Sequence, residues 1–457
     1  MGRALEQGHE DAVDFVDSVN LFLKYFGMNQ DRDRLIARAT ATAGEIGSRS
    51  WYIAQTNAGE RLWQAGQPQA AKAIFETVLA GLGETVSYDR CMTLWRLGQC
   101  KESMGQGAQA IAHHRQAIAD LGQLEPSDGV KRQMGVTQTD LGAVLTAAGQ
   151  FGAARQAYEA SLAIKQEIGG DDRGEATVNF QLGTLEMLEG NLKEATQRYQ
   201  ATLAIFQNLG EPASEAAAWH QLGRAYEEGR SWEQAEDAYR RSADLKEQQG
   251  NLAGAAGTWN QLAMVVEGAG KPKEAEAWYR KAIKADREMN NPRDVARDLG
   301  NLANLLQTQR SDQLPEARRL AEEALAIQQT LDPDSAEIWK TYSILAKIAQ
   351  QSGDPATSRA YRKSERQSYA ANAGSQHELQ KCLNLVQVVV AEVQSIQISP
   401  DLEEGLRYGI DNGLGDLVGA IRLVLAGVRN EDELCVDLNY GDALIVGEIL
   451  QRISAES

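Results

Sequence analysis

The sequence has few cysteines, few prolines and no long apolar run. Its 457 residues include four cysteines and nine prolines. The cysteines Cys91, Cys100, Cys382 and Cys435 lack the spacing of a metal site or a disulfide framework, which favours a reducing compartment. No apolar run reaches the roughly 18 residues of a membrane-spanning helix, and the first ten residues are polar and unlike a targeting signal. We therefore expect a cytoplasmic, bacterial-type protein without disulfides or membrane segments.

Basic residues are also in deficit, and this limits the kinds of partner. The net charge is −18, which disfavours nucleic acid and anionic membrane surfaces as main partners. The hydrophobic content of 43% is too high for a broadly disordered chain. The composition therefore favours a protein or an extended peptide, with basic character, as the partner.

Motifs of catalysis and cofactor binding are missing from the sequence. The pair Gly270-Lys271 is followed by Pro272, so it is not part of a phosphate-binding loop. No Gly-x-Ser-x-Gly, His-Glu-x-x-His or calcium-binding loop pattern occurs. We therefore expect a protein that is not an enzyme, with no catalytic residues, no cofactor and no metal site.

A motif that ends in Leu and a small residue recurs in the middle of the chain every 40 residues. Its copies are residues 179–183, 219–223 and 259–263 (Asn-Phe-Gln-Leu-Gly, Trp-His-Gln-Leu-Gly and Trp-Asn-Gln-Leu-Ala). An alanine follows each small residue after twelve positions, and a tyrosine follows after four more, at Ala195, Ala235, Ala275, Tyr199, Tyr239 and Tyr279. A fixed period of this size indicates stacked supersecondary units.

Close packing of two helices explains the small residues. Leu with Gly or Ala in a first helix, and Ala in a second, removes bulk where two antiparallel helices cross, so that the tyrosine is buried between them. One copy carries the complete pattern, at Trp219, Leu222, Gly223, Tyr226, Ala235 and Tyr239. This pattern resembles the tetratricopeptide repeat (TPR) family. The 40-residue step is longer than the basic unit of about 34 residues and is similar to the kinesin-light-chain-like type.

The resemblance implies an all-α fold in which about eight helical hairpins form a right-handed superhelix over residues 52–372. The small-residue markers are Gly59, Gly98, Gly142, Gly183, Gly223, Ala263, Ala303 and Ala346. In the seventh unit two extra turn residues move the partner alanine to Ala317, and in the eighth unit Ser358 takes its place.

The regions on either side of the array have a different pattern. Residues 1–51 predict a helical N-terminal cap, and a second interpretation is that they are the remnant of a longer protein. Residues 370–376 predict a short linker. Residues 377–457 predict an acidic helical C-terminal domain, with 14 acidic and 5 basic residues and core helices over 379–396, 417–428 and 442–453. Residues 416–429 and 442–450 of this region resemble the small helical module that follows TPR arrays in bacterial signalling and conflict proteins.

The resemblance places the ligand site on the first helices, which line the concave groove of TPR arrays. At the sixth position of successive units this sequence has Arg96, Asp140, Gln181, Gln221, Gln261 and Asn301. The four carboxamides, called here the carboxamide ladder, can pair with an extended peptide backbone without reading its side chains. The alternative is that Gln is simply a polar helix former on a solvated face.

The fifth and ninth positions vary from unit to unit, which fits unit-by-unit specificity. The candidate binding residues there are Phe180, His220, Arg224, Asn260 and Asn304. Arg224 with His220 is a candidate anion site, although Glu227 and Glu228 on the next turn are alternative partners for the arginine.

Several other conspicuous residues have simpler interpretations. Trp219 and Trp259 match the packing tryptophan of the family, so they are expected in the core. Cys91 and Cys100 are expected to pack rather than to bind metal. The second-helix pair His113-His114 is expected at the surface.

Two hypotheses of different kinds follow. The first is a non-catalytic scaffold that binds a protein or peptide in its groove. The second is the sensor or adaptor arm of a bacterial signalling or defence system, working with a separate ATPase or protease.

Overall fold

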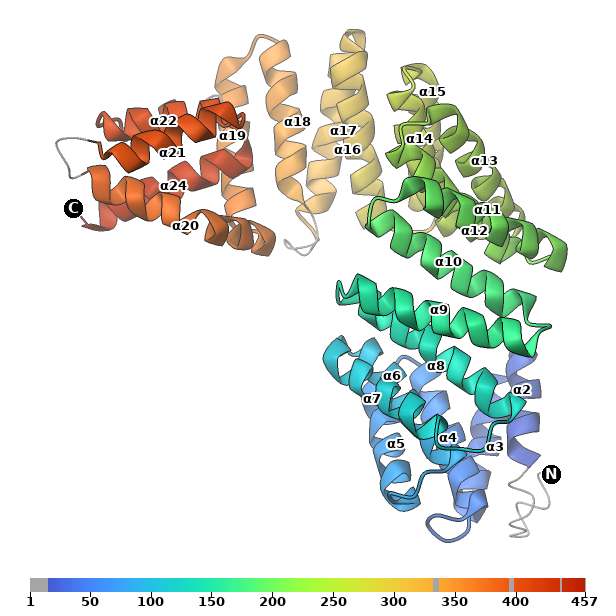
Figure 1. Cartoon of the computed structure of the whole chain (residues 1–457). Helices are drawn as coiled ribbons and strands as arrows, with labels where there is room; N and C mark the ends of the chain where they lie inside the picture. The colour runs from blue at the N-terminus through green and yellow to red at the C-terminus, as the bar shows by residue number, and fades with distance from the viewer. Residues whose placement is uncertain (1–14, 332–336, 394–397, 436–437, 457) are drawn as a thin grey trace. The chain divides into compact units, whose positions relative to one another are not determined.

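The computed structural model describes residues 15–331, 337–393, 398–435 and 438–456. The chain divides into two compact units, Met1–Arg230 and Ser231–Ser457, which are described separately below. Every regular element in these residues is a helix (Figure 1), which confirms the predicted all-α class. None of the described helices combines the length and the apolar character that a membrane-spanning helix needs.

The first unit is a series of helical hairpins. Two helices, α2 (Val16–Tyr25) and α3 (Asn29–Thr42), lie within the predicted cap, whose residues 1–14 are outside the described residues. The hairpins that follow are α4 (Arg49–Gln64) with α5 (Pro68–Leu82), α6 (Tyr88–Ser103) with α7 (Gly107–Leu121), α8 (Asp128–Ala147) with α9 (Phe151–Ile168), and α10 (Asp172–Leu188) with α11 (Leu192–Leu209). The last helix of the unit is α12 (Pro212–Glu228).

Serine side chains fix where several first helices begin. Ser48, Ser87 and Ser127 precede α4, α6 and α8, and each hydroxyl oxygen accepts a hydrogen bond of 3.2 Å from a backbone N–H in the first turn. Such caps satisfy N–H groups that have no partner within the helix, and each stabilises it by about 1 kcal/mol. The starts of α4, α6 and α8 are therefore encoded locally.

The small residues allow the helix crossings that their spacing predicts. A Cβ added at Gly142 would lie 2.6 Å from the ring of Tyr158, and one added at Gly183 would lie 2.9 Å from the ring of Tyr199. Both distances are too short for real carbon atoms, so only glycine fits without a shift of the ring. Tyr158 and Tyr199 are almost completely buried, which confirms the predicted packing.

The second hairpin has a histidine at this aromatic position. His114 is completely buried, and a Cβ added at Gly98 would lie 2.5 Å from its ring. Neither ring nitrogen has a hydrogen-bond partner among the described residues, and burial lowers the pKa of His114 to about 4. The predicted surface position is therefore wrong for His114, because this residue occupies the packing position that Tyr158 occupies one hairpin later.

The second unit continues with hairpins and ends in a bundle. Its hairpin helices are α13 (Trp232–Gln248), α14 (Leu252–Gly268), α15 (Pro272–Glu288), α16 (Pro292–Gln309), α17 (Leu314–Gln328), α18 (Ile338–Gln351) and α19 (Pro355–Ala370). The 3₁₀ turn η2 (Ser311–Gln313) accommodates the extra residues predicted between α16 and α17, and Ala317 is buried as expected. Ser358 takes the alanine place in α19, and its hydroxyl donates to the backbone oxygen of Ala346 at 2.9 Å.

The C-terminal helices share one hydrophobic core. They are α20 (Ala373–Val393), α21 (Pro400–Asp411), α22 (Gly415–Leu425), the short α23 (Glu431–Leu434) and α24 (Tyr440–Glu456). Val389, Leu406, Ile421 and Val446 from four of these helices meet in that core. The predicted core helices are present, although residues 394–397 are outside the described residues.

The predicted linker over residues 370–376 is wrong. Helix α19 ends at Ala370 and α20 begins at Ala373, so only two residues separate them. Residues 370–376 include three alanines, which are strong helix formers and allow α20 to start early. The division into residues 1–51, 52–372 and 377–457 stays a prediction.

Candidate binding surface on the first helices

The carboxamide ladder residues lie on first helices in both units. Gln181 is on α10 and Gln221 on α12 of the first unit, and Gln261 is on α14 and Asn301 on α16 of the second. All four residues are partly buried, so they are neither core residues nor fully solvated. Their alignment into one ladder stays a prediction.

Arg96 on α6 is held by side chains of α4. Its Nε donates to Glu60 Oε1 at 2.7 Å, a second nitrogen contacts the same oxygen, and Nη1 donates to the Tyr52 hydroxyl at 3.3 Å. The side chain is only 14% exposed. Burial alone would lower the pKa of Arg96, but Glu60 and Tyr52 raise it overall, so the guanidinium stays charged. Arg96 therefore joins neighbouring first helices in addition to its predicted place on the binding surface.

Asp140, the sixth-position residue of α8, is also tied to the helix before it. Its Oδ2 accepts from Trp95 Nε1 at 2.7 Å and from Gln99 Nε2 at 3.3 Å. Burial raises the pKa of Asp140, while these two donors lower it. Hydrogen bonds from uncharged donors thus hold this carboxylate in place and orient the Trp95 ring.

A pocket of about 220 Å³ lies where these first helices meet. We call it the aromatic pocket, and its lining residues are Lys24, Glu60, Trp63, Gln64, Phe75, Trp95, Arg96 and Gln99. Trp63 Nε1 donates to Ser103 Oγ at 3.1 Å, so both tryptophans of the pocket have their indole N–H groups engaged elsewhere.

The other predicted residues of the first unit lie on α10 and α12. Phe180 packs edge-on against Tyr199, with 5.5 Å between ring centroids. Arg224 is exposed, and its Nη1 donates to Gln221 Oε1 at 3.2 Å, which joins two predicted site residues. His220 is partly buried on the same helix. The anion site formed by Arg224 and His220 stays a prediction.

In the second unit, Asn260 on α14 is engaged with a buried carboxylate. Its Nδ2 donates to Asp298 Oδ1 on α16 at 2.6 Å, and both residues are almost completely buried. Burial raises the pKa of Asp298 to about 7, although Arg297 opposes this shift through an ion pair of 2.9 Å. Asn260 is therefore held inside the surface, whereas Asn304 is partly buried.

Several residues that shape this surface are not among the predicted site residues. Most of them stand at ligand positions of the family, so applying these positions to every repeat would have selected them. Glu60 and Gln99 occupy the ninth position of their units, and Trp63 occupies the twelfth position, which is another family ligand position. Asp298 has no such signal, because it stands at a position that the family does not use for binding.

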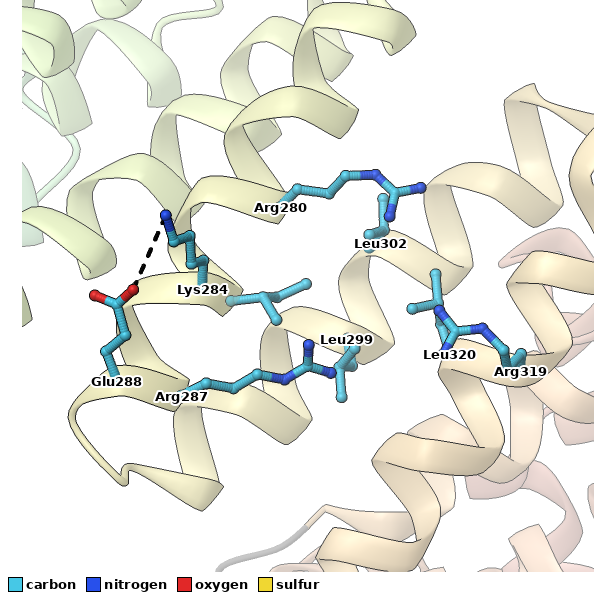
Figure 2. Close-up of a pocket in the computed structure, with 9 residues that line it drawn as sticks. Arg280, Lys284, Arg287, Glu288, Leu299, Leu302, Arg319 and Leu320 are labelled. Carbon is cyan, nitrogen blue, oxygen red and sulfur yellow. Dashed lines mark ion pairs between the residues drawn. The ribbon is translucent and has the colours of Figure 1, made fainter.

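The second helices carry a different kind of surface. A pocket of about 320 Å³, called here the arginine pocket, is lined by Arg280, Ile283, Lys284, Arg287, Glu288, Leu299, Leu302, Arg319 and Leu320. Figure 2 shows Arg280 and Arg287 extending across the pocket from α15, and Lys284 turned toward Glu288.

The arginines of this pocket already have carboxylate partners. Arg319 contacts Glu316 at 2.9 Å on its own helix, α17. Arg280 on α15 reaches the same Glu316 at 3.7 Å, and Arg287 on α15 contacts Glu323 on α17. The pairs made by Arg280 and Arg287 join the consecutive second helices α15 and α17, and all three pairs neutralise cations around the pocket.

Across the part of the chain that the structure describes, no three His, Cys, Asp or Glu residues are grouped so that they could hold a metal ion. Cys91 and Cys100 are buried and free, as expected for packing residues, and burial raises the pKa of each thiol to about 11.

Comparison with known protein families identifies the repeats. One tetratricopeptide repeat profile matches residues 174–248 and 254–330, and a second matches residues 136–172. No curated protein matches the sequence.

Several solved structures have a similar fold at low sequence identity. The apo form of RapI is 12% identical with a TM-score of 0.59, covering 78% of this chain and 97% of that one. The apo form of the quorum sensor NprR from B. thuringiensis is 13% identical with a TM-score of 0.52, covering 79% and 99%.

A third similar structure is a Signal Transduction ATPase with Numerous Domains (STAND) protein with a tetratricopeptide repeat sensor from Pyrococcus horikoshii. It is 15% identical with a TM-score of 0.54, and the match covers 73% of this chain. The chain spans about half of that protein, 51% of its length. At these identities the three likenesses concern the fold alone.

Proposed function

Because this chain is a tetratricopeptide repeat protein over residues 136–330, a scaffold for protein–protein interaction, we propose that its first helices bind an extended segment of another protein without performing chemistry. The observation that carries this proposal is the placement of Gln181, Gln221, Gln261 and Asn301 on first helices at one repeat position, each partly buried. Carboxamides offer both donors and an acceptor, so they suit a peptide backbone.

Fixed polar groups beside the ladder support the same function. Arg96 and Asp140 are partly buried, and hydrogen bonds of 2.7 Å to Glu60 and from Trp95 hold them between first helices. Groups that are already oriented lose little side-chain entropy when a ligand arrives. A surface of this kind is prepared for a partner before the partner binds.

The proposed partner has basic character. The chain has 64 acidic residues against 46 basic ones, and the field of a strongly acidic protein draws in basic segments and repels acidic ones. Nucleic acid and membrane surfaces are not proposed as partners, and the location we propose is cytoplasmic.

The test compares partner capture by three full-length proteins. The first is the wild type, and the second carries Gln181→Ala, Gln221→Ala, Gln261→Ala and Asn301→Ala. The third is a matched control that changes four exposed carboxamides of second helices to alanine, namely Gln156, Gln197, Gln234 and Gln248. Each tagged protein is incubated with bacterial lysate, and captured proteins are quantified by mass spectrometry.

The proposal predicts that a partner captured by the wild type and by the control is reduced at least tenfold on the ladder variant. Circular dichroism and thermal unfolding verify that all three proteins are equally folded. Equal capture by all three would refute the role of the ladder. Loss of the partner on the control alone would move the interaction to the second helices.

A second candidate function is the sensor or adaptor arm of a bacterial signalling or defence system. Its support is the fold likeness to a quorum sensor and to a STAND protein with a tetratricopeptide repeat sensor. An ATPase or protease encoded next to this chain and captured by it would favour this function. Capture of small basic peptides alone would favour the scaffold.

A further inference from the structure

We infer that the aromatic pocket is an anchor site that takes one aromatic side chain of the bound segment. This inference rests on the proposed function, because it assigns a specific contact to the same first-helix surface. The occupant is an uncharged ring such as indole or phenol, inserted against Trp63 of α4 and Trp95 of α6.

The size of the pocket fits a single side chain. Its volume is about 220 Å³, below the roughly 300 Å³ at which sites for drug-sized ligands begin. One aromatic side chain buries about 150–250 Å² and dominates the energetics of many interfaces. A pocket of this size therefore suits one anchoring residue of a longer ligand.

The walls are aromatic and held in position. Trp63 is 36% exposed, so its ring is available on one side, and Phe75 is buried beneath the surface with 1% exposure. Because Ser103 and Asp140 accept from the two indole N–H groups, a ligand can contact both rings without leaving an indole N–H unsatisfied. The Arg96 guanidinium carbon lies 5.9 Å from the centroid of the Trp95 ring. Offset or edge-on stacking against such rings adds about 0.5–1.5 kcal/mol beyond burial.

The charges of the pocket argue against a cationic occupant. Glu60 is already paired with Arg96, and Gln64 accepts from Arg32 at 3.1 Å. Lys24 is the remaining charged lining residue, and no ion pair is found for it among the described residues. The pocket thus combines aromatic walls with one ammonium group that can meet a backbone carbonyl or carboxylate next to the anchor.

The combination of the two tryptophans is specific to this pair of hairpins. Trp63 is the twelfth residue of its unit and Trp95 the fifth of the next. The corresponding pairs in the following hairpins are Glu102 with Thr139, Thr146 with Phe180, and Met187 with His220. An anchor at one place only would set the position of the bound segment along a ladder that is otherwise repetitive.

The inference is tested with the full chain containing 5-fluorotryptophan, observed by fluorine NMR. The probe is N-acetyl-tryptophanamide at millimolar concentration, and N-acetyl-lysinamide and N-acetyl-glycinamide are the controls. Trp63→Phe and Trp95→Phe assign the two resonances among the eight tryptophans. We expect saturable shifts of these two resonances with the aromatic probe and none with either control.

Two variants distinguish binding at the anchor site from nonspecific binding of the probe. Trp63→Ala removes an exposed wall and should weaken probe binding at least fivefold at the Trp95 resonance. Trp95→Phe keeps an aromatic wall and should retain binding within about twofold, as judged from the Trp63 resonance. Equal shifts of all tryptophans, no saturable shift, a shift with lysinamide, or unchanged binding to Trp63→Ala would each overturn the inference.

The result for the anchor site can also be distinguished from the result for the proposed function. The ladder variant changes no lining residue of the aromatic pocket, so it should bind the probe like the wild type. Probe binding without partner capture would refute the proposed function and leave the pocket as an aromatic site. Partner capture that depends on the ladder, without probe binding, would overturn the anchor alone.

Discussion

The two pockets, one in each unit, differ in how their polar and charged side chains are held. In the first unit, Trp95, Gln99 and Asp140 form hydrogen bonds around an aromatic pocket, and Arg96 is largely buried against Glu60. In the second unit, the arginines of the arginine pocket are exposed and paired with glutamates of the same helix or of the neighbouring second helix.

The same repeat therefore supports two kinds of polar surface. Partly buried groups with fixed geometry can form a selective surface, because they are ordered before a ligand binds. Exposed ion pairs contribute little energy each and are screened by salt. The arginine pocket is larger, but its cations are already compensated, which favours the proposed binding on the first helices over binding at the arginine pocket.

The units also differ in which buried group titrates. The second unit buries Asp298, whose carboxyl has a pKa raised from 3.8 to about 7 by burial. The folded form binds this proton more tightly than the unfolded form does. The protonated carboxyl therefore contributes its full stabilisation of the folded state below pH 4, and this contribution is lost as the pH rises toward 7. Burial also raises the pKa of Asp286, which acts in the same direction.

The largest effect is expected from Asp298→Asn. Asparagine keeps an oxygen acceptor for Asn260 and carries no charge, so we expect the variant to be more stable at pH 8 by about 2–4 kcal/mol. Thermal unfolding of wild type and variant at pH 5 and pH 8 measures the difference. A variant that is less stable at both pH values would show that the carboxylate is favourable in the folded state.

His114 of the first unit should respond to pH in the opposite direction. The pKa of His114 is lowered from 6.5 to about 4 by burial, so its stabilisation is full above pH 6.5 and is lost as the pH falls toward 4. His114→Phe places at this position the ring that Phe75 provides in the first hairpin. We expect the variant to be more stable than wild type by about 2–3 kcal/mol at pH 4.5, and by less at pH 8.

Hydrogen exchange of peptides from α6 and α7 measures this local effect. His113→Phe, on the adjacent and partly buried position, is the matched control and should change the pH dependence less. Equal pH dependence of wild type and His114→Phe would contradict the assignment.

A smaller loss is expected from Arg96→Ala. The change removes the links from α6 to Glu60 and Tyr52 and leaves a partly buried carboxylate with fewer partners. We expect about 2 kcal/mol of local destabilisation, since Arg96 is less buried than the pairs whose disruption costs 3–5 kcal/mol. Hydrogen exchange of α4 and α6 should accelerate accordingly. Arg96→Lys should give an exchange rate between those of wild type and Arg96→Ala, because lysine keeps the charge but lacks the planar, multidentate donors of the guanidinium.

The smallest effect is expected from Arg319→Ala in the second unit. Its side chain is 60% exposed, and exposed ion pairs contribute less than about 1 kcal/mol. Urea unfolding should therefore show a small change that diminishes further in 0.5 M salt. A loss as large as that of Arg96→Ala would remove the contrast between the two surfaces.

The 40-residue period was sufficient to predict the hairpins, because the residues it relates are the ones that pack. Gly142 and Gly183 face Tyr158 and Tyr199 as their spacing predicts. The surface prediction for His114 is wrong, because its place in the period, and not its polarity, determines its burial. The sequence does not predict the early start of α20, because an alanine stretch that contains glycine is compatible with a linker as well as with a helix.

The candidate site was less predictable than the fold. The register assigns Gln181 and Gln221 to first helices, but it does not reveal that Asn260 is paired with Asp298. That contact joins side chains of two different repeats. The repeat pattern relates equivalent positions and does not predict which non-equivalent side chains of two repeats form a pair. The aromatic pocket depends on Trp63, which the repeat pattern does not require at its position.

The central claim is that a partner lies on the first helices, and hydroxyl-radical footprinting of the full chain with and without a captured partner tests it most directly. Trp63, Trp95 and Phe180 on first helices, and Trp278 and Tyr361 on second helices, are all at least partly accessible reporters. The account predicts that the partner reduces oxidation of the first-helix reporters and leaves Trp278 and Tyr361 unchanged. Protection of Trp278 and Tyr361, with Trp63, Trp95 and Phe180 oxidised as in the free protein, would contradict it.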